Sequence, residues 1–214
     1  MSRAHSSTTI RLVASLSAFL LTSSFVSAAP ANTRSTAVPY SALPSEPRVQ
    51  SAALDDGLSV TLETGAGARL IVRRNRHRVS RIDLRVLRPW KLRTVDVDGD
   101  GRRDIVLGVY KSTRFWPYPH PCLFVYRWDE RLVPVWRGAN LSKPFVDFEF
   151  ADGHLFSIEV EADGSRCLNS YHWNGFGFTG EWQRGHWKRA AFASTSADRI
   201  TVSAGGALYS FRTR

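Results

Sequence analysis

The residues with the clearest chemical potential lie in one short run, 96–104, with the sequence DVDGDGRRD. In a calcium loop, alternate side chains and one backbone carbonyl point inward and supply about 6–8 oxygen ligands to a hard cation. The spacing gives these roles to the side chains of Asp96, Asp98, Asp100 and Asp104 and to the carbonyl of Arg102. The run therefore predicts one Ca²⁺ site. The alternative is a solvated Asp/Gly turn without a metal.

The segment that follows distinguishes this run from an EF-hand. An EF-hand loop ends in a glutamate and is flanked by helices. Here the equivalent position is Leu107, inside the apolar, β-branched run 105–109. Such a run predicts a buried strand. Asp104 would then supply the carboxylate that an EF-hand takes from its glutamate.

Over residues 96–108 the chain resembles the FG-GAP or VCBS repeat, a calcium-loop-plus-strand unit of integrin α-subunit propellers and of many secreted bacterial proteins. The match to the pattern D-x-D-x-D-G-x-x-D-hydrophobic-x-x-G is complete. The resemblance implies a β-propeller blade with a structural Ca²⁺ and with function carried by other loops. It is specific for about one blade and looser for the other three.

The elements that must position this loop are strands. From residue 51 onward no segment has sustained helical periodicity, and short β-rich runs are separated by Gly, Asn and Asp. Weak repeats align Ile105 with Val60, Ile158 and Thr201–Val202, at intervals typical of a propeller blade of about 40–50 residues. We therefore predict an all-β fold, a small propeller of about four blades over 51–214. An incomplete propeller, a sandwich-like stack and half of a dimeric ring are the alternatives.

The last repeat stops before its outer strand. A closed propeller would take that strand from the N-terminal segment, either from 40–43 or from 49–51. The other repeats carry too few carboxylates at the metal-loop position, so the acidic residues near Asp55, Asp147 and Asp198 are predicted to be in turns.

The N-terminus has the features of a targeting segment. Arg3 and Arg11 accompany the apolar stretch 12–26, which predicts a signal peptide over residues 1–28 and export to the periplasm or the outside of the cell. Residues 29–50 are rich in Pro and Ser, which predicts an extended arm. Removal of the signal peptide would take away these two arginines, so the formal charge of the mature chain would be +8 instead of +10. No later stretch approaches membrane-spanning length.

The positive charge favours anionic neighbours, although the arginines are spread along the chain as they would be for solubility alone. The densest cluster lies between two strand-like runs and predicts an exposed basic turn, with Arg73, Arg74, Arg76 and Arg78 as candidate contacts. No nucleic-acid-binding motif accompanies it. The expected partner is therefore a protein or an anionic surface polymer.

A second candidate contact surface is the proline-stiffened loop 114–121. Its candidate contacts are Arg114, Phe115, Trp116, Tyr118 and His120. Proline lowers the entropy cost of holding rings exposed, which suits stacking against a sugar, a peptide or a partner. A loop that folds back over the blade core is the other interpretation.

No nucleophile elbow, phosphate-binding loop or dinucleotide fingerprint is present, and the histidines are isolated. Four acids at alternating strand positions are compatible either with a glycosidase pair or with a solvent face: Asp147, Glu149, Glu159 and Glu161. The sequence therefore favours a calcium-stabilised binding module. A secreted hydrolase acting on an anionic polymer or glycan is the alternative.

The two cysteines, Cys122 and Cys167, are compatible with one disulfide in an exported protein. The bond also requires Cα atoms within about 7 Å, which the sequence does not decide.

Overall fold

The computed structural model describes residues 37–114, 116–138 and 141–213. The predicted signal peptide, 1–28, and residues 29–36 of the predicted arm lie outside the described residues. The described part consists of strands with two short 3-10 turns, η1 (Tyr40–Ala42) and η2 (Arg85–Leu87). The predicted all-β fold is confirmed. No helix in the described ranges is long and apolar enough to cross a membrane.

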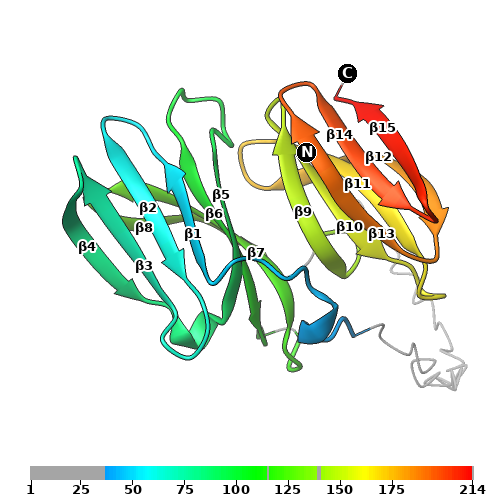
Figure 1. Ribbon diagram of the computed structural model, residues 1–214, viewed down its shortest axis with the longest axis horizontal. Helices are drawn as coiled ribbons and strands as arrows, with labels where there is room; N and C mark the ends of the chain where they lie inside the picture. Colours follow the sequence, from blue (N-terminus) through cyan, green and yellow to red (C-terminus); the bar gives the residue numbers. More distant parts are fainter. Residues whose placement is uncertain (1–36, 115, 139–140, 214) are drawn as a thin grey trace, which may run out of the picture. The chain divides into compact units, whose positions relative to one another are not determined.

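The strands form four antiparallel sheets, arranged as a four-bladed β-propeller (Figure 1). The first blade contains β1 (Val49–Ala53), β2 (Leu58–Glu63), β3 (Arg69–Arg74) and β4 (His77–Asp83). The second contains β5 (Pro89–Val95), β6 (Asp104–Lys111), β7 (His120–Asp129) and β8 (Arg131–Gly138). The third contains β9 (Phe145–Ala151), β10 (His154–Val160), β11 (Arg166–Trp173) and β12 (Phe178–Trp187). The last contains β13 (Ala190–Ser196), β14 (Arg199–Ala204) and β15 (Ala207–Arg212).

The internal repeat inferred from the sequence corresponds to one strand of each blade. The aligned positions Val60, Ile105, Ile158 and Val202 lie in β2, β6, β10 and β14, the second strand of each blade. All four side chains are fully buried. Burying one such side chain stabilises the fold by about 1.5–3 kcal/mol. The repeat therefore marks the centre of each blade's core, and the alignment is confirmed.

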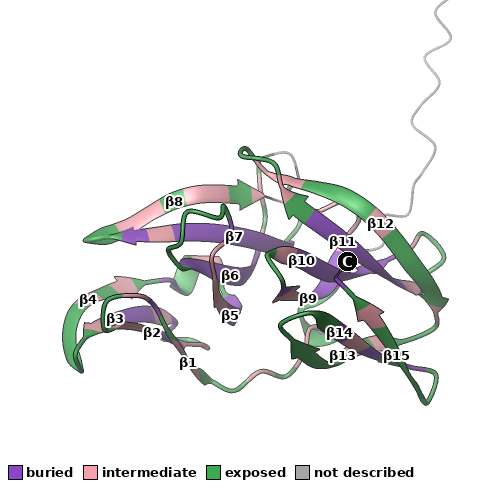
Figure 2. Ribbon diagram, turned by 90° about the horizontal axis from the view of Figure 1, so that it is seen from above, coloured by how far each residue is buried: buried purple, intermediate pink, exposed green. Residues whose placement is uncertain are grey.

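Hydrophobic clusters join successive blades. One cluster packs β2 and β3 against β6 and β7, a second packs the second blade against the third around Trp90 and Phe148, and a third packs β10 and β11 against β14. The buried residues follow β6, β7, β10 and β11, whereas β8 and β12 are mostly half-buried or exposed (Figure 2). In the described part of the chain, no cluster joins the first blade to the last.

Neither 40–43 nor 49–51 supplies an outer strand to the last blade, so that prediction is wrong. Val49–Ala53 is β1, which pairs with β2 in the first blade. Residues 40–42 form η1, and Pro39 precedes this turn while Pro44 and Pro47 follow it. Proline lacks the N–H that a sheet ladder needs. The last sheet accordingly has three described strands, in the order β13-β14-β15.

Residues 38–50 instead connect the blades through side chains and single hydrogen bonds. Val38 and Leu43 pack in the core between the third and last blades. The Tyr110 hydroxyl donates to the Val38 carbonyl at 3.1 Å. The Gln50 amide bonds the backbone of β5, donating to the Trp90 carbonyl at 3.0 Å and accepting from the Leu92 N–H at 2.8 Å.

Candidate functional site

The aspartate run forms the loop between β5 and β6, and Asp96 closes it. The Asp96 carboxylate accepts hydrogen bonds from the N–H groups of Gly99 at 2.8 Å, Asp100 at 3.1 Å and Gly101 at 2.8 Å. Gly99 and Gly101 have φ of 75° and 83°, a left-handed conformation that glycine adopts at little cost. The Asp96 carboxylate and the two glycines therefore fix the first turn of the loop.

Three of the four predicted carboxylates converge. Single ligand oxygens of Asp96, Asp98 and Asp100 lie within 4.8 Å of one another, and this is the one such group of three or more among the described residues. Two oxygens that each lie 2.3–2.6 Å from a shared Ca²⁺ are at most about 5 Å apart. The spacing and the all-oxygen donor set fit Ca²⁺.

Asp104, the fourth predicted carboxylate, is fully buried at the start of β6 and is not part of that converging group. Its Oδ2 accepts the Val97 N–H at 3.3 Å, whereas its Oδ1 has no hydrogen-bond partner among the described residues. Burial raises the pKa of this carboxyl to about 6. A buried oxygen without a partner is costly, and a cation would relieve that cost.

Arg127 contacts the candidate metal site, and the sequence interpretation missed it. It extends from β7, and its Nη2 lies 2.6 Å from Asp98 Oδ2 and 3.3 Å from Asp100 Oδ2. Its Nε lies 3.5 Å from Asp104 Oδ1. The guanidinium is therefore an internal counter-charge for the loop. The available signal was a lone arginine in the apolar run 123–128.

Arg102 is exposed on the same loop. Its N–H donates to Asp100 Oδ1 at 2.8 Å, and its Nη2 donates to the Trp128 carbonyl at 3.2 Å. The first contact tightens the loop and the second ties it to the end of β7. A ligand role for the Arg102 carbonyl stays a prediction.

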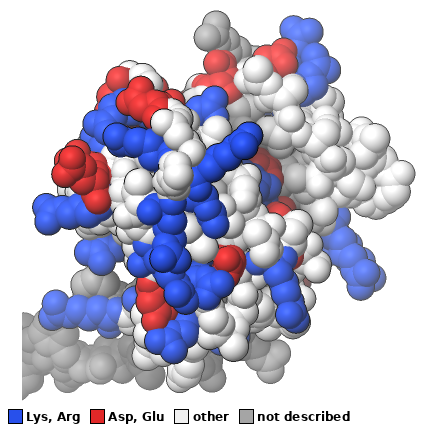
Figure 3. Space-filling view, turned by 60° about the vertical axis from the view of Figure 1, so that its left-hand side comes forward, with Lys and Arg blue, Asp and Glu red and all other residues white. Residues whose placement is uncertain are grey.

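The basic turn lies at the tip of the β3–β4 hairpin, as predicted. Arg74, Arg76 and Arg78 are exposed, and Arg73 is half-buried, with its Nη1 donating to the hydroxyl of a β2 threonine at 3.1 Å. The two turn residues, Asn75 and Arg76, have φ of 48° and 72°, which is typical of a tight two-residue hairpin turn. Lys and Arg side chains are dense on the face shown in Figure 3, which is the side of the molecule where the first blade lies.

The aromatic loop between β6 and β7 partly folds back, with Trp116 against the start of β7. Trp116 is half-buried, exchanges two backbone hydrogen bonds with Thr113 at 2.8 and 3.2 Å, and meets the His120 ring edge-on at 6.0 Å. His120 is buried as the first residue of β7, so its assignment as an exposed contact is wrong. Tyr118 is 70% exposed, and Arg114 is also exposed. Phe115 lies outside the described residues.

Asp147 and Glu149 on β9 are held in ion pairs with β5. Lys91, itself buried, places its Nζ 2.5 Å from Asp147 Oδ1 and 2.8 Å from Glu149 Oε1. Arg93 makes a two-pronged contact with Glu149 at 2.8 and 2.6 Å. Burial raises the pKa of Asp147. For Glu149 burial acts in the same direction, but the bonds from Arg93 and Lys91 outweigh it and the pKa is lowered. These groups tie the second blade to the third.

Glu159 and Glu161 are likewise engaged. Glu161 pairs with Lys143 at 2.9 Å. Glu159 is fully buried on β10, where its carboxylate accepts three hydroxyl hydrogen bonds, from Ser142 at 2.8 Å, Ser157 at 2.6 Å and Tyr171 at 2.5 Å. All four alternating acids therefore have hydrogen-bond or ion-pair partners within the described residues.

Both cysteines are free and buried, Cys122 on β7 and Cys167 on β11, so the structure contains no disulfide between them. Burial raises the pKa of the Cys122 thiol to about 12 and that of Cys167 to about 11. Thiols with such values are poor nucleophiles near neutral pH.

A scan against models of known protein families finds no match to this chain, and a search of curated proteins finds no relative. The resemblance of residues 96–108 to the FG-GAP repeat therefore depends on those residues alone.

Proposed function

We propose that this chain is an exported, calcium-stabilised β-propeller of the FG-GAP or VCBS kind, acting as a binding module for a protein or an anionic polymer in the periplasm or outside the cell. The observation that carries the proposal is the β3–β4 hairpin, which presents Arg74, Arg76 and Arg78 to solvent at one tip. Clustered arginines attract an anionic partner and orient it during encounter. Tyr118, on the loop of the second blade, adds an exposed ring for stacking.

Calcium has a structural role in this proposal. Asp96, Asp98 and Asp100 would hold the ion, which would neutralise the carboxylates and fix the β5–β6 connection. Asp55, from the turn between β1 and β2, accepts the Arg103 N–H at 2.5 Å. Ordering the loop would therefore also strengthen the contact between the first and second blades.

A thermal melt with Ca²⁺ and with a chelator tests the metal site. Ca²⁺ is expected to raise the Tm of the wild type, because a ligand that binds only the folded state stabilises it. Asp98→Ala should remove most of that increment. Since the substitution also breaks the ion pair with Arg127, the informative quantity is the Ca²⁺-dependent change in Tm, not the Tm itself.

Asp129→Ala is the matched control, because it removes one exposed carboxylate from the end of β7 outside the loop. It should retain the full Ca²⁺ increment. Identical wild-type melts in Ca²⁺ and in chelator would contradict the metal site.

Binding to dextran sulfate, a model anionic polymer, tests the contact surface. Arg76→Ser/Arg78→Ser should weaken the affinity by about fivefold per charge removed, a value typical of arginines near an anionic surface. Added salt should reduce the difference.

The control for this experiment, Arg131→Ser/Arg137→Ser, removes two exposed arginines from β8 and should have a smaller effect. Equal losses in the two double variants would show that only net charge matters, and the hairpin would then not be the contact surface.

A further inference from the structure

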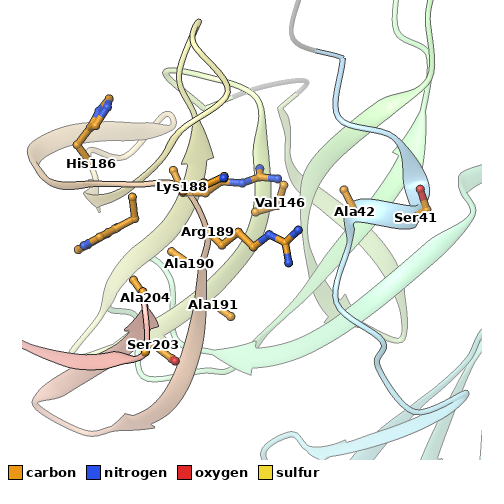
Figure 4. Close-up of a pocket in the computed structure, with 14 residues that line it drawn as sticks. Ser41, Ala42, Val146, His186, Lys188, Arg189, Ala190, Ala191, Ser203 and Ala204 are labelled. Carbon is orange, nitrogen blue, oxygen red and sulfur yellow. The ribbon is translucent and has the colours of Figure 1, made fainter.

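A pocket of about 1060 Å³ lies at the junction of the third and last blades (Figure 4). Its described lining includes no residue of the aspartate loop or of the basic hairpin. It forms where β12 passes into β13, so Lys188 and Arg189 of that connection line it together with Arg166, the first residue of β11. Val146, Trp187 and Ala190 supply apolar wall. The pocket is therefore apolar with a cationic side.

The charge of the pocket wall is uncompensated. The described lining residues include three permanent cations and no Asp or Glu. Asp163 is the acid of an adjoining pocket that shares Lys188 and Arg189, and its Oδ2 lies 3.3 Å from His186 Nε2. His186 points away from Arg189, which extends towards Ala42 (Figure 4).

Arg166 is the decisive residue. Its Nη1 is buried and has no hydrogen-bond partner within the described ranges. Burial lowers the pKa of this guanidinium. Lys91, Arg93 and Arg127, in contrast, each have a carboxylate partner. Since no carboxylate of the described residues pairs with it, the Arg166 guanidinium adds its full charge to the positive potential of the pocket wall, which favours an anionic ligand.

We propose that this pocket binds a small ligand that carries an oxyanion, a carboxylate or a phosphate group, on a compact and partly apolar body. The planar guanidinium of Arg166 presents paired donors that match either group. Lys188 and Arg189 add positive potential, and Trp187 offers a ring face for the body of the ligand. The site lies on the third and last blades, and it is independent of the function proposed above.

Calorimetric titration of the purified protein at fixed ionic strength tests this site with two probes, inorganic phosphate and glucuronate. The wild type is expected to bind at least one of them, and the probe that binds identifies the group recognised. Arg166→Gln should raise the Kd about tenfold or more, the effect of losing a charge-assisted hydrogen bond. It should leave the stability of the free protein unchanged or raise it, because the guanidinium has no partner to lose.

Arg131→Gln is the matched control, since it removes an exposed arginine from β8 and should leave the Kd unchanged. Lys188→Gln/Arg189→Gln keeps Arg166 and changes only exposed residues, so it should weaken binding even if Arg166→Gln fails to fold. Absence of binding by both probes, or equal weakening in Arg131→Gln, would overturn the proposal. Neither result bears on the calcium and dextran sulfate experiments, which use variants of the first two blades.

Discussion

Individual buried charges differ in how far their polar atoms are paired. Lys91, Arg93 and their carboxylate partners are fully paired and act in packing. Asp104 and Arg166 each keep one buried polar atom without a hydrogen bond. Since unpaired buried groups destabilise a fold, their presence calls for a compensating role. Asp104 begins the strand that follows the proposed calcium loop, and Arg166 lines the proposed anion pocket.

Glu159 predicts a pH dependence of stability. Burial raises its pKa above the usual 4.5, although hydrogen bonds from Ser157, Tyr171 and Ser142 oppose the shift. The folded state therefore holds a proton that the unfolded state has released, and the contribution of Glu159 is lost as pH rises from about 4.5 through the folded pKa. Glu159→Gln cannot ionise, so it lacks this loss.

Urea denaturation of both proteins at several pH values checks the prediction. The unfolding free energy of the wild type minus that of Glu159→Gln should decrease as pH rises through this window. The contribution of Asp147 cancels in this difference, because its pKa is raised in both proteins. A difference that is constant with pH would show that Glu159 titrates normally.

At the scale of the strand, Gly108 on β6 occupies a position with no room for a side chain. A Cβ at this position would lie 2.6 Å from the Trp90 ring and 2.9 Å from the Phe148 ring, both in the core between the second and third blades. We expect Gly108→Ala to lower the unfolding free energy by about 1–3 kcal/mol, the usual cost of overpacking.

Gly67→Ala is the control for this substitution, because a Cβ there meets no atom within 4 Å and the residue has no positive φ. It should change stability by less than about 0.5 kcal/mol. Denaturant unfolding of the two variants distinguishes the outcomes, and a neutral Gly108→Ala would mean that Trp90 moves aside freely.

Strands and turns were predictable because their signals are local. The apolar run after Asp104 became β6, and the arginines between two β-rich runs became an exposed hairpin. The ion pair of Lys91 with Asp147 joins residues 56 positions apart, and Arg127 reaches Asp98 across 29. Contacts between residues so far apart leave no periodic pattern in the sequence, so they could not be predicted from it. The N-terminal strand was misassigned because closure depends on where the chain runs in space, not on its β propensity.

At the scale of the whole propeller, the four blades differ in how deeply their strands are buried. The strands β6 and β10 are buried along almost their whole length, whereas β13 and β15 are largely exposed. Hydrophobic clusters span three successive blade junctions, and in the described chain none spans the junction of the last blade with the first. The last blade is therefore held mainly from one side.

Native-state hydrogen exchange should reveal this difference. Amides of β15 and β13 are expected to exchange first, through local opening of the last blade, and those of β6, β7, β10 and β11 last. Mass spectrometry of peptic fragments measures both groups in one experiment. Uniform protection of all four blades would show instead that the propeller opens only as a unit.

The order of the strands also has a consequence for how the protein is made. Every sheet is a meander of consecutive strands, and no described strand is borrowed from a distant part of the chain. Pairing partners are therefore close in sequence, which favours rapid folding. The strands of each blade can pair as soon as their own segment emerges from the ribosome, and they bury their apolar face once the next blade has followed.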